Sequence, residues 1–229
     1  MTTFLNYFLL FLIYSVIGWI SETTFCLITT KKLVDRGFLL GPYCPIYGFG
    51  ALIVTLYLEQ YRDNIITVFL LSVILCSILE YITSYLLEKI FKARWWDYSK
   101  KKFNLGGRVC LENSIIFGIA GLIGLYLINP IITNLILKIN PTTIFIISII
   151  SLIIFIIDTI ISCNVINKLK ITINNLELKD STQEISRMVR EKIKQSNKIL
   201  ERRLVKAFPQ IKLEKLIKKE KLKELLNKK

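Results

Sequence analysis

Long apolar runs with few charges constrain the fold of this chain more than any other feature. They extend over about residues 4–28, 38–58, 65–90, 109–128 and 143–163. A membrane-spanning helix needs about 20 consecutive, mainly apolar residues. Overall, 53% of the residues are hydrophobic, whereas soluble domains are about 45–50% apolar even with glycine included. The sequence therefore predicts an all-α, polytopic membrane helix bundle with about five spans in residues 1–165, of which the second is the least regular.

The basic residues gather in the tail and in alternate loops. Residues 164–229 hold 19 Lys/Arg against 8 Asp/Glu, which accounts for most of the net charge of +14. The loops at about residues 31–36 and 92–108 are also basic, whereas the two other connections are nearly neutral. Basic loops of membrane proteins face the cytoplasm. We expect an outside N-terminus, a cytoplasmic C-terminus and no nucleic-acid partner.

The tail, residues 166–229, alternates apolar and charged residues at helical spacing on both sides of Pro209. Because proline interrupts a helix, the pattern predicts two basic amphipathic helices in the cytoplasm. Such helices can lie on anionic lipid, pair with a partner or a second copy, or remain solvated. The sequence leaves these alternatives open.

Several catalytic classes lack their residues here. The chain has no histidine, no CxxC pair and no GxxxxGK[ST] loop. The commonest zinc sites, histidine-based triads and a P-loop for ATP are thereby excluded. We expect no cofactor, no metal and no identifiable catalytic residue, and ATP-driven transport would need a separate ATPase subunit. Of the five cysteines, only Cys44, between Tyr43 and Pro45, suggests more than a small buried side chain.

Carboxylates inside apolar runs are costly and need an explanation. Four such residues stand out: Glu22, Glu80, Glu88 and Glu112. On a helix, Glu80, Ser84 and Glu88 share one face, with Tyr81 adjacent. One explanation is internal ion pairing with Arg36, Arg94 or Arg108, and another is a substrate or proton site. For Glu88 and Glu112, a position at the edge of a span is a third explanation.

The stretch RGFLLGPYCPIYGFG, residues 36–50, has four glycines and two prolines. An uninterrupted helix is disfavoured there, because Pro42 and Pro45 lack backbone donors and restrict the residues before them. Non-helical backbone at membrane depth is tolerated only where protein or a watery cavity covers it. The segment predicts either a re-entrant or broken helix or an ordinary interfacial turn.

The loop from Trp95 to Arg108 combines aromatic and charged residues. Trp95, Trp96 and Tyr98 fit an aromatic belt at the membrane surface. That belt does not explain the interleaved polar residues, which are Arg94, Asp97, Asn104 and Arg108. Two arginines can clamp a phosphate or carboxylate, so an anionic lipid headgroup or a phosphorylated carrier would suit the loop.

Four ordered motifs give the chain a family resemblance. They are GWISE at 18–22, RGFLLGPYCPIYGFG at 36–50, LEYITSYLLEKIFKARWWDYS at 79–99 and FNLGGRVCLENSIIFG at 103–118. Over about residues 4–160 the chain resembles the bacterial membrane proteins known as CmpB-like, or type IV, ABC-transporter permeases. The resemblance implies a multi-pass protein of the bacterial cell membrane, partnered by a separate ATPase.

Three functions remain open at this point: a transport component, a scaffold or regulator acting through the tail, and an enzyme acting on a lipid-linked substrate. Five spans are few for a complete path, so we also expect a homo-oligomer or a larger assembly. The candidate binding residues are Glu22, Arg36, Cys44, Tyr47, Glu80, Tyr81, Arg94, Trp95, Trp96, Asp97, Asn104 and Arg108.

Overall fold

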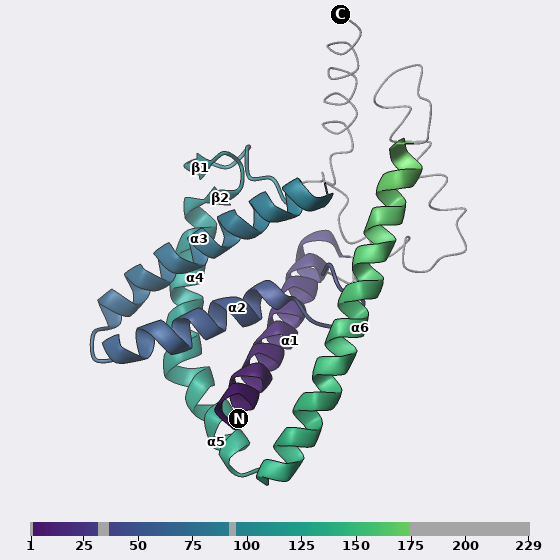
Figure 1. Cartoon of the computed structure of the whole chain (residues 1–229). Helices are drawn as coiled ribbons and strands as arrows, with labels where there is room; N and C mark the ends of the chain where they lie inside the picture. Colours follow the sequence, from purple (N-terminus) through teal and green to yellow (C-terminus); the bar gives the residue numbers. More distant parts are fainter. Residues whose placement is uncertain (1, 32–36, 92–94, 175–229) are drawn as a thin grey trace, which may run out of the picture.

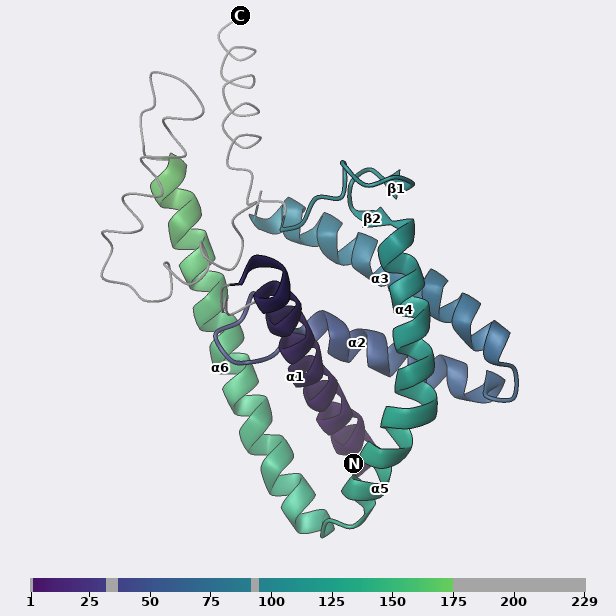
Figure 2. The same cartoon turned by 180° about the vertical axis from the view of Figure 1, so that it is seen from behind.

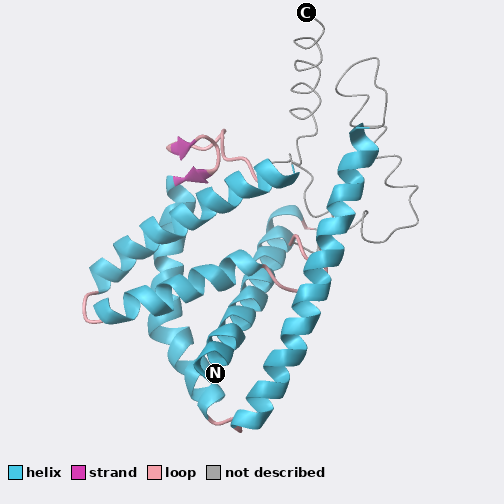
Figure 3. Cartoon of the chain, viewed as in Figure 1, coloured by secondary structure: helices cyan, strands magenta, loops and turns pink. Residues whose placement is uncertain are grey.

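The computed structural model describes residues 2–31, 37–91 and 95–174, and this part of the chain is almost entirely helical (Figures 1 and 3). Its main helices are α1 (Thr2–Thr30), α2 (Pro45–Ile53), α3 (Ile65–Phe91), α4 (Leu111–Ile123), α5 (Asn129–Leu137) and α6 (Pro141–Asn174). Short segments join them: the π-helical η1 (Val54–Leu58) and η3 (Gly124–Ile128), and the 3₁₀ turn η2 (Glu59–Tyr61). A small hairpin of β1 (Asn104–Leu105) and β2 (Val109–Cys110) precedes α4. The all-α prediction is confirmed.

Four stretches of helix in the described residues are long and apolar enough to cross a membrane: Phe4–Thr29, Ile65–Phe91, Leu111–Leu137 and Pro141–Val165. They match the first, third, fourth and fifth predicted spans. The second predicted span, about residues 38–58, differs, because residues 37–44 are not helical and helix begins only at Pro45. The chain is therefore a membrane protein, and its described residues contain four full-length helices and one short, broken segment.

The backbone of residues 37–44 lies deep between helices. The amide of Cys44 donates to the carbonyl oxygen of Ser15 at 2.8 Å, and Ser15 is near the middle of the first span. The amides of Leu40 and Gly41 donate to the carboxylate of Asp158 at 2.8 and 2.7 Å. With a rise of 1.5 Å per residue, Asp158 lies about 10 Å inside the end of its span at Val165. These side-chain and backbone acceptors satisfy the amides of the loop, and non-helical backbone is therefore tolerated at this depth in the membrane.

The helix ends meet in two groups. Phe38, Phe91, Trp95 and Cys163 pack in one apolar cluster, which brings together the ends of α3 and the span in α6. Leu5, Ile136 and Ile144 pack in another, which joins the start of α1 to α5 and the start of α6. Figure 2 shows the hairpin and the far end of α6 on one side, and the N-terminus and the α5–α6 turn on the other.

Small residues let the helices approach closely. A Cβ added at Gly118 would lie 2.4 Å from the ring of Phe69, and one at Gly121 would lie 2.2 Å from the hydroxyl of Ser72. Both contacts join α4 to α3, where the absence of a side chain on glycine lets the two helices approach closely. The hydroxyl of Tyr14 donates to Asn129 at 2.7 Å, and the Asn129 amide donates to Thr55 at 2.7 Å, which connects α1, α5 and η1.

The predicted tail helices lie outside the described residues, except that α6 continues to Asn174. The division into a membrane domain of residues 1–165 and a basic tail of residues 166–229 therefore stays a prediction.

Candidate functional site

Two carboxylates from different spans are each bound by a tyrosine hydroxyl. Tyr47, in the first turn of α2, donates to Glu22 of α1 at 2.6 Å. The contact depends on a glycine, because a Cβ at Gly18 would lie only 2.3 Å from the ring of Tyr47. Gly18 thereby allows the tyrosine to lie flat against α1 and reach the carboxylate one helical turn further on.

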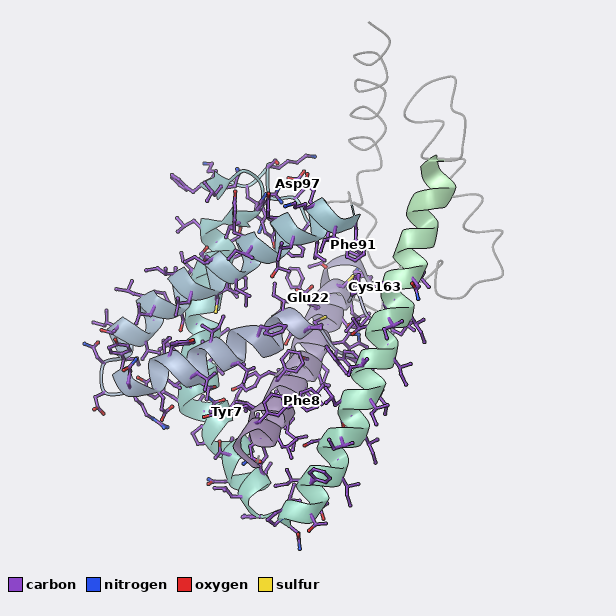
Figure 4. All side chains as sticks on the ribbon, viewed as in Figure 1. Tyr7, Phe8, Glu22, Phe91, Asp97 and Cys163 are labelled. Atoms are coloured by element: carbon purple, nitrogen blue, oxygen red, sulfur yellow. The ribbon has the colours of Figure 1, made fainter. Side chains whose placement is uncertain are left out.

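The second pair joins α3 to the loop before the hairpin. Tyr98 donates to the Oε1 atom of Glu80 at 3.1 Å. Glu80 is only 5% exposed, and its other oxygen, Oε2, is buried with no hydrogen-bond partner within residues 2–31, 37–91 and 95–174. The carboxylate of Glu22 acts electrostatically on both Glu80 and Tyr98, so the two pairs form one polar cluster, which we call the Glu–Tyr cluster. Figure 4 shows Glu22 on the part of α1 that faces the start of α2.

Arg108 lies beside this cluster but binds other residues. Its guanidinium pairs with Glu88 at 2.8 Å and donates to Ser84 at 3.2 Å. It also lies over the rings of Tyr81 and Tyr85, with the guanidinium carbon 5.7 and 5.6 Å from their centroids. The face of α3 predicted to carry Glu80, Ser84 and Glu88 does turn inward, and an internal ion pair forms there with Glu88.

Burial raises the pKa of Tyr98 above the ordinary tyrosine value, and the nearby carboxylates of Glu80 and Glu22 raise it further. In the unfolded chain the same phenol ionises near pH 10. The unfolded state therefore loses this proton first, and the contribution of Tyr98 to stability is complete below about pH 10 and falls above it.

We expect the stability of the wild-type protein to fall more steeply above about pH 10 than that of Tyr98→Phe, which has no proton to lose there. Thermal unfolding in detergent over an alkaline pH series measures both slopes. Equal slopes would show that the Tyr98 hydroxyl is not buried beside the carboxylates.

Most other polar residues of the 95–110 loop shape the loop itself. The Asn104 side chain donates to the carbonyl of Lys101 at 2.7 Å and accepts from the amide of Gly107 at 2.9 Å. Asp97 accepts from the backbone and the hydroxyl of Ser99. Gly106 and Gly107 both have positive φ, which favours glycine at this turn. These contacts shape the loop that carries Tyr98, and Figure 4 shows Asp97 of this loop close to α3.

The two tryptophans differ from the predicted aromatic belt. Trp95 is buried and packs against the rings of Phe38 and Phe91. The Trp96 indole donates to the carbonyl of Arg108 at 2.9 Å. Protein, rather than the lipid interface, therefore surrounds Trp95, because the loop folds back onto the ends of α3 and α6.

The remaining candidates are dispersed or lie outside the described residues. Cys44 is buried and caps the start of α2, and Tyr81 is exposed beside Arg108. Glu112 is 67% exposed and pairs with Lys101 at 2.9 Å, as a position at the edge of a span explains. Arg36 and Arg94 lie outside the described residues, so the predicted two-arginine clamp stays a prediction.

Sequence reasoning missed the role of Asp158. Besides the amides of Leu40 and Gly41, this carboxylate accepts hydrogen bonds from Tyr43 and from Ser162. The available signal was its position, because a carboxylate within an apolar run needs partners. It is the residue that anchors the broken second segment to α6.

The comparisons with known proteins agree with the fold. A family model described as "Putative ABC-transporter type IV" (ABC_trans_CmpB) matches residues 9–163. Searches of curated proteins and of solved structures gave no match. The match covers the four span-like helices, the broken segment and the Glu–Tyr cluster. The chain therefore belongs to this family and is a membrane transport component.

Proposed function

We propose that this chain is the permease subunit of an ABC-type transporter of the bacterial cell membrane. ATP hydrolysis is then supplied by a separate subunit, because the sequence has no P-loop. In this proposal the hairpin and the tail of the chain lie in the cytoplasm, and its N-terminus lies outside the cell. The charges of the basic loops support this orientation, because these loops follow α1 and α3 in the sequence and the end of α3 packs against the end of the span in α6.

The observation that carries the proposal is the Glu–Tyr cluster. Charged residues inside a membrane are costly, and in transporters they mark pathways or coupling sites. Here Glu22 and Glu80 come from different spans, and each meets a tyrosine from a segment that is not a full span. Tyr47 begins the broken second segment, and irregular segments of this kind surround the sites of many transporters.

The arrangement also gives the ATPase a mechanical route to the cluster. Tyr98 belongs to the loop that leads into the hairpin. Its backbone amide donates to the carbonyl of Gly107 at 2.8 Å, which ties Tyr98 to the hairpin. A partner that moves the hairpin would move the Tyr98 hydroxyl relative to Glu80. In this proposal the hairpin transmits the movement of the ATPase to the membrane site.

Purification of the tagged full-length chain from its own host membranes in mild detergent tests the proposal. We expect an ATP-binding chain to co-purify, detectable by photolabelling with an azido-ATP analogue. Glu80→Gln is expected to keep this partner but to lower ATP hydrolysis by the complex about tenfold, which corresponds to about 1.4 kcal/mol of barrier.

Glu112→Gln is the matched control, because Glu112 is exposed and lies outside the cluster. It should leave ATP hydrolysis unchanged. A folded wild-type chain that retains no ATP-binding partner would contradict the permease assignment. Equal losses of ATP hydrolysis in Glu80→Gln and Glu112→Gln would contradict the role of the Glu–Tyr cluster.

A further inference from the structure

We propose that Glu80 binds an exchangeable proton inside the bundle, delivered through the hydroxyl of Tyr98 from the hairpin end. The inference deepens the proposed function, on which it rests for the role of that proton in transport. Proton binding itself is a property of this chain alone and can be tested without the ATPase.

The first observation is the state of the Glu80 carboxyl. One oxygen accepts from Tyr98, and the other is buried with no hydrogen-bond partner among the residues that the structure describes, in a residue that is 5% exposed. A charged oxygen buried in this way is far more costly than a neutral one. Protonation removes the charge, and it needs no additional space.

The second observation is the set of charges that face Glu80. From α1 it faces the carboxylate of Glu22, and from the loop it faces the neutral phenol of Tyr98. On α3, the helix of Glu80, Cys76 lies one turn away. From the hairpin, Arg108 donates to Ser84 and is paired with Glu88. The charge of the second carboxylate, Glu22, disfavours the charged form of Glu80. The pair therefore favours binding of one proton, and Glu80 is the more buried of the two.

The chemistry of the cluster selects a proton over other ligands. Tyr47 and Tyr98 both use their hydroxyl hydrogens on carboxylates, so the cluster presents mainly acceptor atoms. An anion would be repelled by the two carboxylates. No group of three or more His, Cys, Asp or Glu that could hold a metal ion occurs in the described ranges. A proton fits both the charge and the small size of the site.

Tyr98 gives the proton a route. Its side chain is partly exposed at the hairpin end, whereas its hydroxyl bonds to Glu80. The Tyr98 hydroxyl can pass its hydrogen to the Glu80 carboxylate while its oxygen takes a proton from a hydronium ion at the hairpin end, which becomes water. One proton then moves from the solvent to Glu80, and Tyr98 ends in the neutral form in which it began.

Infrared difference spectroscopy of the purified full-length chain in lipid vesicles tests the proposal. On acidification we expect a carbonyl band of a protonated carboxyl to appear, to shift in deuterated buffer, and to be absent from Glu80→Gln. Glu112→Gln, the matched control, should keep the band. In Tyr98→Phe the band should remain, its midpoint should move to higher pH, and its deuterium shift should develop more slowly.

A second measurement uses the wild-type chain alone, in case Glu80→Gln does not fold. A hydrophobic carbodiimide reacts with protonated carboxyls in membranes, and mass spectrometry locates the adduct. We expect an adduct on Glu80 that decreases as the pH rises. An unchanged band in folded Glu80→Gln, or no adduct on Glu80 at any pH, would overturn the proposal. Because neither measurement involves the ATPase, these failures would be distinct from the absence of an ATP-binding partner.

Discussion

Asp158→Ala is expected to lower the free energy of unfolding by about 4 kcal/mol, the largest effect of any single substitution considered for this protein. The substitution leaves the amides of Leu40 and Gly41 and the hydroxyl of Tyr43 without their acceptor. Each buried donor that loses its partner costs about 1–3 kcal/mol. Water cannot replace the carboxylate easily, because the loop is packed at membrane depth against α6.

Asp158→Asn separates the loss of charge from the loss of the acceptor. Asparagine has a side chain of similar size and keeps one acceptor oxygen. We therefore expect Asp158→Asn to lower the free energy of unfolding less than Asp158→Ala does. Asp63→Ala is the matched control, since Asp63 is an exposed aspartate in the turn before α3. Thermal unfolding in detergent, followed by circular dichroism, measures all three. Equal stability of Asp158→Ala and Asp63→Ala would show that the loop does not depend on this anchor.

Gly48→Ala is expected to force α2 away from α1 and to cost about 3 kcal/mol. The added Cβ would lie 2.4 Å from the Ser15 hydroxyl and 2.5 Å from both the ring and the backbone oxygen of Phe11. The ring could rotate, but the backbone oxygen belongs to a continuous helix and cannot move alone. Because Tyr47 is the preceding residue, we also expect its hydrogen bond to Glu22 to weaken.

Gly50→Ala provides the control on the same helix. Its added Cβ would find its nearest neighbours at 3.8 and 3.9 Å, which is ordinary contact. Alanine also favours a helix over glycine by about 1 kcal/mol, so this variant should be at least as stable as the wild type. Thermal unfolding of the two variants in the same detergent distinguishes them. If Gly48→Ala were as stable as Gly50→Ala, the close approach of α1 and α2 would be refuted.

The apolar runs predicted the helices well, because a span must satisfy its backbone within itself and so carries its own signal. Residues 65–90, for example, correspond to α3, and residues 143–163 lie within α6. The second run was harder to interpret. Its hydropathy suggested a span, whereas its glycines and prolines suggested a break, and the structure shows a short helix after irregular backbone.

Site residues were predicted unevenly. The cost of burying charge singled out Glu22 and Glu80, and the structure brings these two residues into one cluster. Sequence spacing could not supply their partners, because Tyr47 and Tyr98 are 25 and 18 residues away along the chain. The same limit applies to Arg108, because the sequence offered it several carboxylates as partners and only the fold brought it to Glu88.

The sequence by itself determined that this chain is a helical membrane protein, that it cannot bind ATP through a P-loop, and that carboxylates lie within its spans. Those conclusions depend on local composition and on the low polarity of lipid, which act on each segment separately. Only the tertiary structure decided that Asp158 anchors the irregular loop, that Trp95 is buried, and that one oxygen of Glu80 meets no hydrogen-bond donor in the described part of the chain. These three features depend on contacts between segments that are distant in the sequence. The local sequence patterns would allow many arrangements of the helices, and close packing at a few glycines selects one of them.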